Sequence, residues 1–181
     1  MKRLNVKNLV TAAVCLALCL VLPFLTGQIP QIGGALSPMH IPVLLGGFLC
    51  GPWWAVAVGL SAPLLRHILF HMPPLITAVA MCFELGTYGL VSGLLYRRLP
   101  GRNSSIYVSL IAAMIAGRVV WGAMRVALSG ASGEPFTWAA FMAGAFFNAI
   151  PGIIVHIALI PALVIVLKRA GVFHEERLAA A

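Results

Sequence analysis

The chain has 181 residues, of which 61% are hydrophobic and only 9% are charged. Because soluble domains carry about 25% charged residues, this composition excludes a water-soluble globular protein. The formal charge of +8 would favour nucleic-acid binding in a soluble protein. Here, however, no Asp, Glu, Lys or Arg occurs between Lys7 and Arg66, and a helix needs about 20 apolar residues to cross a bilayer. We therefore expect a membrane protein that does not bind nucleic acid.

Hydropathy, with glycine, proline and charged residues as boundaries, predicts six transmembrane helices. In chain order they cover residues 8–26, 37–50, 52–70, 73–96, 105–128 and 137–167. The second is short and begins with the helix-start sequence Ser37-Pro38, so we expect it to be tilted, partly re-entrant or shielded by its neighbours. The sixth is long, and Pro151 and Pro161 predict bends in it. The expected architecture is one all-α transmembrane domain over residues 1–181, with short tails near residues 1–7 and 168–181.

Nine of the twelve basic residues fall on one predicted side of the membrane. They are Lys2, Arg3, Lys7, Arg97, Arg98, Arg102, Lys168, Arg169 and Arg177. The positive-inside rule then places both termini in the cytoplasm. The loops over residues 28–36, 71–73 and 129–136 face outward, and they contain one acidic residue, Glu134. We expect a multi-pass protein of the cell (inner or plasma) membrane.

The charged residues inside the predicted helices are the most informative ones. A charge near the bilayer centre costs at least about 2.5–3.5 kcal/mol on insertion scales unless it is paired or hydrated. Glu84 lies in the fourth span, and helical spacing places Arg118, Trp121 and Arg125 on one stripe of the fifth. Asn148 in the sixth span comes to a comparable depth, so these side chains can converge in one cavity.

Two interpretations of these polar residues stay open. In the first, Glu84 and Arg118 form an ion pair that pins two helices together, and Asn148 supplies an interhelical hydrogen bond. In the second, the outer half of the bundle binds an anionic ligand, because Arg66, Arg118 and Arg125 outnumber the single carboxylate there. For Arg66, which lies near the end of its span, extension of the side chain towards the membrane interface is the alternative to a place in that site.

Histidines near the outer helix ends include His67, which we retain as a candidate substrate-binding residue, and His40. Neutral imidazoles in a helical bundle are more often packing residues than ligands, and no sequence motif for a metal accompanies them. The chain also has no nucleotide-binding or nucleophile motif, so we expect no enzyme activity, no metal and no cofactor. If it moves a solute uphill, the energy comes from partner proteins or from an ion gradient.

The first span carries Ala13 and Ala17 at the spacing that allows another helix to approach closely. This motif is weak by itself. Packing inside the bundle, against the third or the sixth span, is the alternative to contact with a partner protein.

Three sequence features together resemble those of one transporter family. They are the Ala13-Val14-Cys15-Leu16-Ala17 motif, the segment MHIPVLLGGFLCGP from Met39 to Pro52, and Gly59-Leu60. With six spans in a short chain, they resemble the substrate-binding S-component of energy-coupling factor (ECF) vitamin transporters. The resemblance implies a six-helix protein with an outward-facing vitamin pocket closed by the loops after spans one, three and five. It also implies contact of Ala13 and Ala17 with a transmembrane coupling subunit that is attached to two cytoplasmic ATPases.

The resemblance leaves the ligand open, since pocket residues in this family differ with the substrate. The surplus of buried cations favours a vitamin with a carboxylate, and pantothenate fits that description. A pyridoxine-like or other aromatic vitamin is the alternative, because Trp121 could stack on a ring and Glu84 could bind its hydroxyls. A scaffold membrane protein of the cell-shape type and a stand-alone ion-coupled carrier are the alternatives to an S-component.

Overall fold

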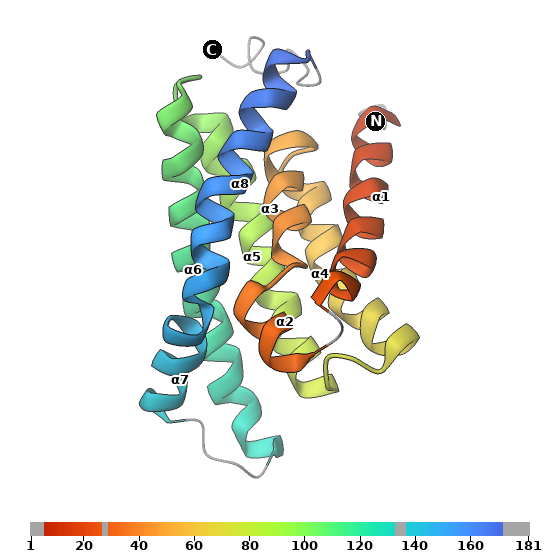
Figure 1. Ribbon diagram of the computed structural model, residues 1–181, viewed down its shortest axis with the longest axis vertical. Helices are drawn as coiled ribbons and strands as arrows, with labels where there is room; N and C mark the ends of the chain where they lie inside the picture. The colour runs from red at the N-terminus through yellow and green to blue at the C-terminus, as the bar shows by residue number, and fades with distance from the viewer. Residues whose placement is uncertain (1–5, 27–28, 133–136, 172–181) are drawn as a thin grey trace.

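The computed structural model describes residues 6–26, 29–132 and 137–171, and every regular element in these ranges is a helix. The elements are α1 (Val6–Val21), the short 3-10 helix η1 (Leu22–Thr26), α2 (Pro30–Leu36), α3 (His40–Leu49), α4 (Pro52–Phe70), α5 (Leu75–Arg98), α6 (Asn103–Ser132), α7 (Trp138–Ala145), the 3-10 helix η2 (Phe147–Ala149) and α8 (Ile150–Arg169). Six segments are long and apolar enough to cross a membrane, which confirms the predicted all-α, six-helix fold. The start of α1 and the end of α8 lie at one end of the bundle, and α2 and α7 lie at the other (Figure 1).

Helix α5 is at the centre of the bundle and packs against α3, α4 and α6. Its contact with α4 is unusually close, because glycines let the two backbones meet. A Cβ atom at Gly89 would lie 2.7 Å from the backbone carbon of Ala55, and one at Gly59 would lie 2.6 Å from that of Leu85. Neither position has room for a side chain, so α4 and α5 form one tightly packed wall.

The second predicted span, residues 37–50, contains one short helix, α3, and a separate short helix, α2, lies before it in the predicted outer loop. Ser37 has a left-handed backbone (φ 46°) and ends α2, and α3 begins only at His40. The prediction that Ser37-Pro38 starts the helix was therefore wrong by three residues. Helix α2 packs closely on α8, since a Cβ at Gly152 would lie 2.5 Å from the Ala35 carbonyl oxygen. The expected outer loop is thus partly helical, and it fills the space beyond the short α3.

The sixth predicted span is also divided, into α7, η2 and α8. The break lies at Phe146, whose backbone (φ −124°, ψ −66°) is not helical. Pro151 occupies the first turn of α8, a position that tolerates proline because the missing N–H has no helical partner there. Helix α8 continues through Pro161 to Arg169. The interruption therefore lies before Pro151 and leaves Asn148 in a short 3-10 turn.

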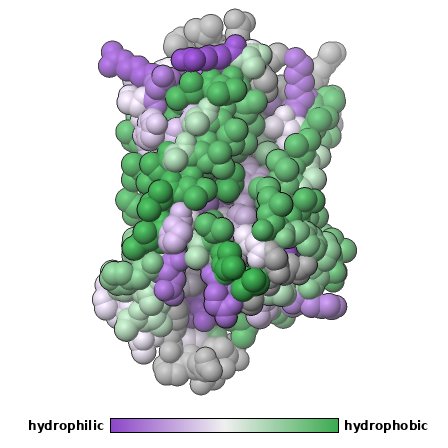
Figure 2. Space-filling view, viewed as in Figure 1, coloured by the Kyte–Doolittle hydropathy of each residue, from purple (hydrophilic) through white to green (hydrophobic). Residues whose placement is uncertain are grey.

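Hydrophobic residues cover the middle of the molecule on the face shown in Figure 2, and hydrophilic residues gather towards both ends. Helix α1 packs inward through Ala12, Cys15 and Cys19, while Ala13 and Ala17 are exposed on its outer face. The structure therefore contradicts the alternative in which these two alanines pack inside the bundle.

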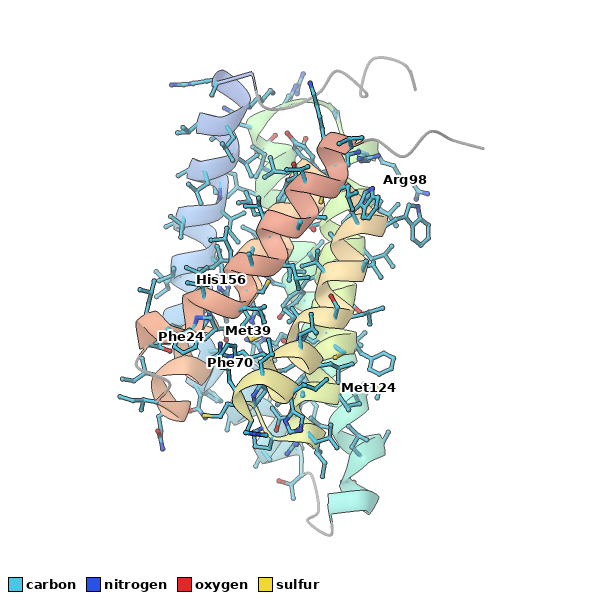
Figure 3. The ribbon with its side chains drawn as sticks, turned by 90° about the vertical axis from the view of Figure 1, so that its right-hand side faces the viewer. Phe24, Met39, Phe70, Arg98, Met124 and His156 are labelled. Carbon is cyan, nitrogen blue, oxygen red and sulfur yellow. The ribbon has the colours of Figure 1, made fainter. Side chains whose placement is uncertain are left out.

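Six of the nine basic residues assigned to one side belong to the described part of the chain: Lys7, Arg97, Arg98, Arg102, Lys168 and Arg169. They belong to the segments where α1 begins, α5 ends, α6 begins and α8 ends, at the same end of the bundle (Figure 1). Arg98 is labelled there in Figure 3. Lys2, Arg3, Arg177 and the outer-loop Glu134 lie outside the described residues.

The close contact between α4 and α5 gives a testable prediction. Gly89→Ala forces a methyl group against the Ala55 backbone and should lower the free energy of unfolding by about 1–3 kcal/mol. Gly130→Ala in α6 is the matched control, since nothing lies within 4 Å of its added Cβ. Thermal unfolding of the detergent-solubilised variants measures both. Equal unfolding temperatures for the two variants would show that the α4–α5 contact is looser than described.

Candidate ligand-binding site

A cavity of about 720 Å³ opens among the helices, within the range of about 300–1,000 Å³ that is typical of small-molecule sites. Its walls come from η1, α2, the start of α3, the end of α4, the first half of α5, the middle of α6, and α7 with η2. These elements meet in the half of the bundle away from the start of α1 and the end of α8 (Figure 1). The polar or charged lining residues include Thr26, Gln31, Ser37, His40, Arg66, Thr77, Glu84, Arg118, Trp121 and Asn148.

Glu84 is the centre of the polar wall and is only 1% exposed. Its Oε1 atom accepts a hydrogen bond of 2.8 Å from the Tyr88 hydroxyl and pairs with Arg118 Nη1 at 2.9 Å. The Tyr88 ring lies directly against α6, because the absence of a side chain at Gly117 leaves space for it. The predicted Glu84–Arg118 ion pair therefore exists and joins α5 to α6.

His40, at the start of α3, lies beside this pair and is 4% exposed. Its Nε2 atom is 3.4 Å from Glu84 Oε1, but neither ring nitrogen has a hydrogen-bond partner. The ring stacks on His156 with a centroid distance of 5.9 Å. His40 therefore borders the Glu84–Arg118 pair at the cavity wall.

Of the two alternatives for Arg66, the structure favours the one inside the bundle: its side chain lines the cavity and is 3% exposed. Its Nη1 donates a 2.7 Å hydrogen bond to the Leu20 carbonyl oxygen. The guanidinium carbon also lies 5.1 Å from the centre of the Phe24 ring and 5.3 Å from that of Phe70. Figure 3 shows both rings on the same side of the bundle. These contacts hold the guanidinium inside the protein, so the side chain does not extend to the membrane interface.

The charges of the cavity wall do not balance. Arg66 and Arg118 line it, and Glu84 is the one carboxylate side chain among residues 6–26, 29–132 and 137–171. Glu84 pairs with Arg118, so no carboxylate in those ranges compensates Arg66. A buried, uncompensated cation favours a negatively charged ligand.

Four of the predicted site residues, Glu84, Arg118, Trp121 and Asn148, line this cavity together. The Trp121 ring is stacked on Phe141, with centroids 6.4 Å apart and planes 29° from parallel. Its outer edge packs close to the backbone of Gly144 in α7. The broken sixth span thus supplies the surface that holds Trp121 and brings Asn148 to the cavity.

The other two predicted site residues, Arg125 and His67, are not among the residues that line the cavity. Arg125 shares a stripe with Arg118 but lies two helical turns further along α6, about 10 Å away along the axis. His67 follows Arg66 directly, so the helix turns it in another direction, and its Nδ1 lies 2.8 Å from the Pro73 carbonyl oxygen. Two residues on the same helix face can therefore lie at different depths in the bundle, and only one of them then lines the cavity.

Sequence reasoning counted Arg66 among the cations that favour an anion but did not select it as a site residue, and it did not select His40 either. Arg66 stood out in the sequence because it is one of the few cations inside a span. Its position near the helix end, however, is compatible with a side chain that points to the membrane interface or into the protein. His40 gave no signal beyond its residue type. In the described part of the chain, no group of three or more His, Cys, Asp or Glu side chains could hold a metal ion.

These features define a polytopic α-helical membrane protein with a cavity for a small ligand between its helices. A model of the family described as "ECF transporter, substrate-specific component" matches residues 7–164, and the chain therefore belongs to this family. The resemblance seen in the sequence is confirmed. Such components bind a small substrate and work with a membrane-embedded ATPase module. Neither the curated proteins nor the solved structures contain a match to this chain.

The Glu84–Arg118 pair leads to a prediction about stability. Glu84→Ala leaves Arg118 without its carboxylate and should lower the free energy of unfolding by about 3 kcal/mol. Thr77→Ala is the control, because Thr77 lines the same cavity and is uncharged. Thermal unfolding in detergent without ligand measures the difference. If Glu84→Ala unfolded at the temperature of Thr77→Ala, the pair would contribute nothing to the bundle.

Proposed function

We propose that this chain is the high-affinity vitamin-binding subunit of an ECF importer and that its substrate is a small vitamin with a carboxylate, with pantothenate as the best fit. The observation that supports an anionic substrate is the unbalanced cavity wall, where two arginines meet one carboxylate. The ligand is surrounded by Glu84, Arg118, Trp121 and Asn148, and Arg66 lines the same cavity. His67 and Arg125 are left out, since neither lines the cavity.

The basic residues that gather at the end of the bundle away from the cavity support the proposed orientation. By the positive-inside rule that end faces the cytoplasm, so the cavity opens to the outside of the cell membrane. The chain has no ATPase motif of its own. A transmembrane coupling subunit and two cytoplasmic ATPases supply the energy, and the coupling subunit contacts the exposed Ala13 and Ala17 on α1.

A direct test is the binding of pantothenate and of its alcohol analogue, pantothenol, to the purified protein. The two differ only in the charged end, and a charge-assisted hydrogen bond contributes about 1.5–3 kcal/mol. Pantothenate should therefore bind about ten- to a hundredfold more tightly than pantothenol in calorimetric titrations. Equal affinities would exclude a site that selects a carboxylate, and absence of pantothenate binding would exclude this vitamin.

A pyridoxine-like substrate is the second candidate, favoured by the position of Trp121 on the cavity wall. Trp121→Ala distinguishes the two candidates. For pantothenate the indole is an apolar contact, so the variant should weaken pantothenate and pantothenol by the same factor, up to about tenfold. For an aromatic vitamin, titration with pyridoxine should show binding to the parent protein and loss of it in the variant.

Ala13→Trp and Ala17→Trp test the contact with the coupling subunit. Each adds a large ring where a neighbouring helix must approach closely, so each should abolish uptake in cells while leaving ligand affinity unchanged. Val119→Trp is the control, since Val119 is 59% exposed on α6, away from α1. Loss of both uptake and affinity in the alanine variants would indicate misfolding, and normal uptake would show that α1 is not the contact surface.

A further inference from the structure

Arg66 and Arg118 both line the cavity, but the structure gives them different partners. Arg118 is compensated by Glu84 at 2.9 Å, and Glu84 receives a further hydrogen bond from Tyr88. Within the described ranges Arg66 has no carboxylate within 4.0 Å. Its partners are the neutral Leu20 carbonyl and the faces of two phenylalanine rings.

The contacts of Arg66 also leave part of its binding capacity unused. A guanidinium has five N–H donors in a planar fork that matches a carboxylate. Among the described residues, one hydrogen bond of Arg66 is formed, from Nη1 to Leu20. The two rings that lie near the guanidinium, Phe24 and Phe70, are 5.0 Å apart and edge to face, and each makes a cation–π contact with it. Because Arg66 lines the cavity, a ligand bound there can accept hydrogen bonds from this guanidinium.

We propose that Arg66 is the residue that binds the carboxylate of the substrate and so determines that the site selects an anion. This rests on the proposed function, in which the substrate carries a carboxylate. Arg118 does not select the anion, because a second carboxylate beside it would face Glu84, and like charges repel strongly in a buried site. The Glu84–Arg118 pair instead offers polar contacts to the uncharged part of the substrate.

The experiment measures the affinity ratio between pantothenate and pantothenol in detergent-solubilised variants. Arg66→Gln removes the charge, and the ratio should fall from about ten- to a hundredfold to near one, with pantothenol affinity changed less than about threefold. The matched control is the double variant Glu84→Gln/Arg118→Gln, which removes the other arginine without leaving an unpaired carboxylate. It should retain most of the ratio even where both affinities change, since Arg66 is intact.

Arg66→Lys covers the case in which Arg66→Gln does not fold. Lysine keeps the charge but lacks the planar fork, so the ratio should fall to an intermediate value. A ratio that stays high in either Arg66 variant, or one that is lost in the Glu84→Gln/Arg118→Gln protein, would overturn the assignment and place the carboxylate elsewhere. Failure of the unsubstituted protein to bind pantothenate would instead overturn the proposed substrate, and the assignment of Arg66 with it.

Discussion

The site in this bundle depends on how buried charged side chains are compensated, because the interior of a membrane protein solvates ions poorly. Two arginines, Arg66 and Arg118, line the cavity, but the described residues contain only one carboxylate, Glu84, and it is paired with Arg118. That pair is held by backbone geometry, because Gly117 lets the Tyr88 ring lie against α6 and the Tyr88 hydroxyl then reaches Glu84. The remaining cation, Arg66, is kept in place by a carbonyl oxygen and two aromatic rings, none of which cancels its charge. The uneven compensation gives an otherwise apolar bundle a preference for an anion.

The extent to which the sequence predicts this fold depends on the kind of interaction involved. Hydropathy identifies the six spans because the cost of burying polar groups in lipid acts residue by residue. The same cost identifies Glu84 and Arg118 as a pair, since neither charge is tolerated alone inside a span. Helix α2 escapes prediction because its seven residues include Gly33 and Gly34, which favour loops, and because it is stabilised by close packing on Gly152 of α8. That contact joins segments far apart in the chain.

The direction of Arg66 could not be predicted for a related reason. A cation near a helix end has two compatible environments, the membrane interface and the protein interior, and periodicity places it equally well in both. The decision depends on Leu20 and Phe24, which precede it by more than forty residues and reach it only in the folded bundle. Arg125 could not be excluded from the sequence for a different reason. Helical periodicity gives it the same face of α6 as Arg118, but the cavity extends along only part of that face and does not reach Arg125. Depth is set by where α2, α7 and the loop after α4 close the space.

The two sides of the cavity are built differently: one consists of long packed helices and the other of short helices. The side of short helices is where we expect a ligand to enter. Helices α4, α5 and α6 form one side, where glycines bring backbones together and the Glu84–Arg118 pair joins two of the helices. The other side consists of α2 and α7, short helices connected by loops and 3-10 turns. Segments of this second kind open at a smaller free-energy cost than helices packed along their length. Arg66 lies on the side of long helices at the end of α4 and contacts η1, the segment that leads into α2, through Phe24. A ligand that binds Arg66 therefore contacts the wall of long helices at the residue that also joins it to η1, next to the wall of short helices.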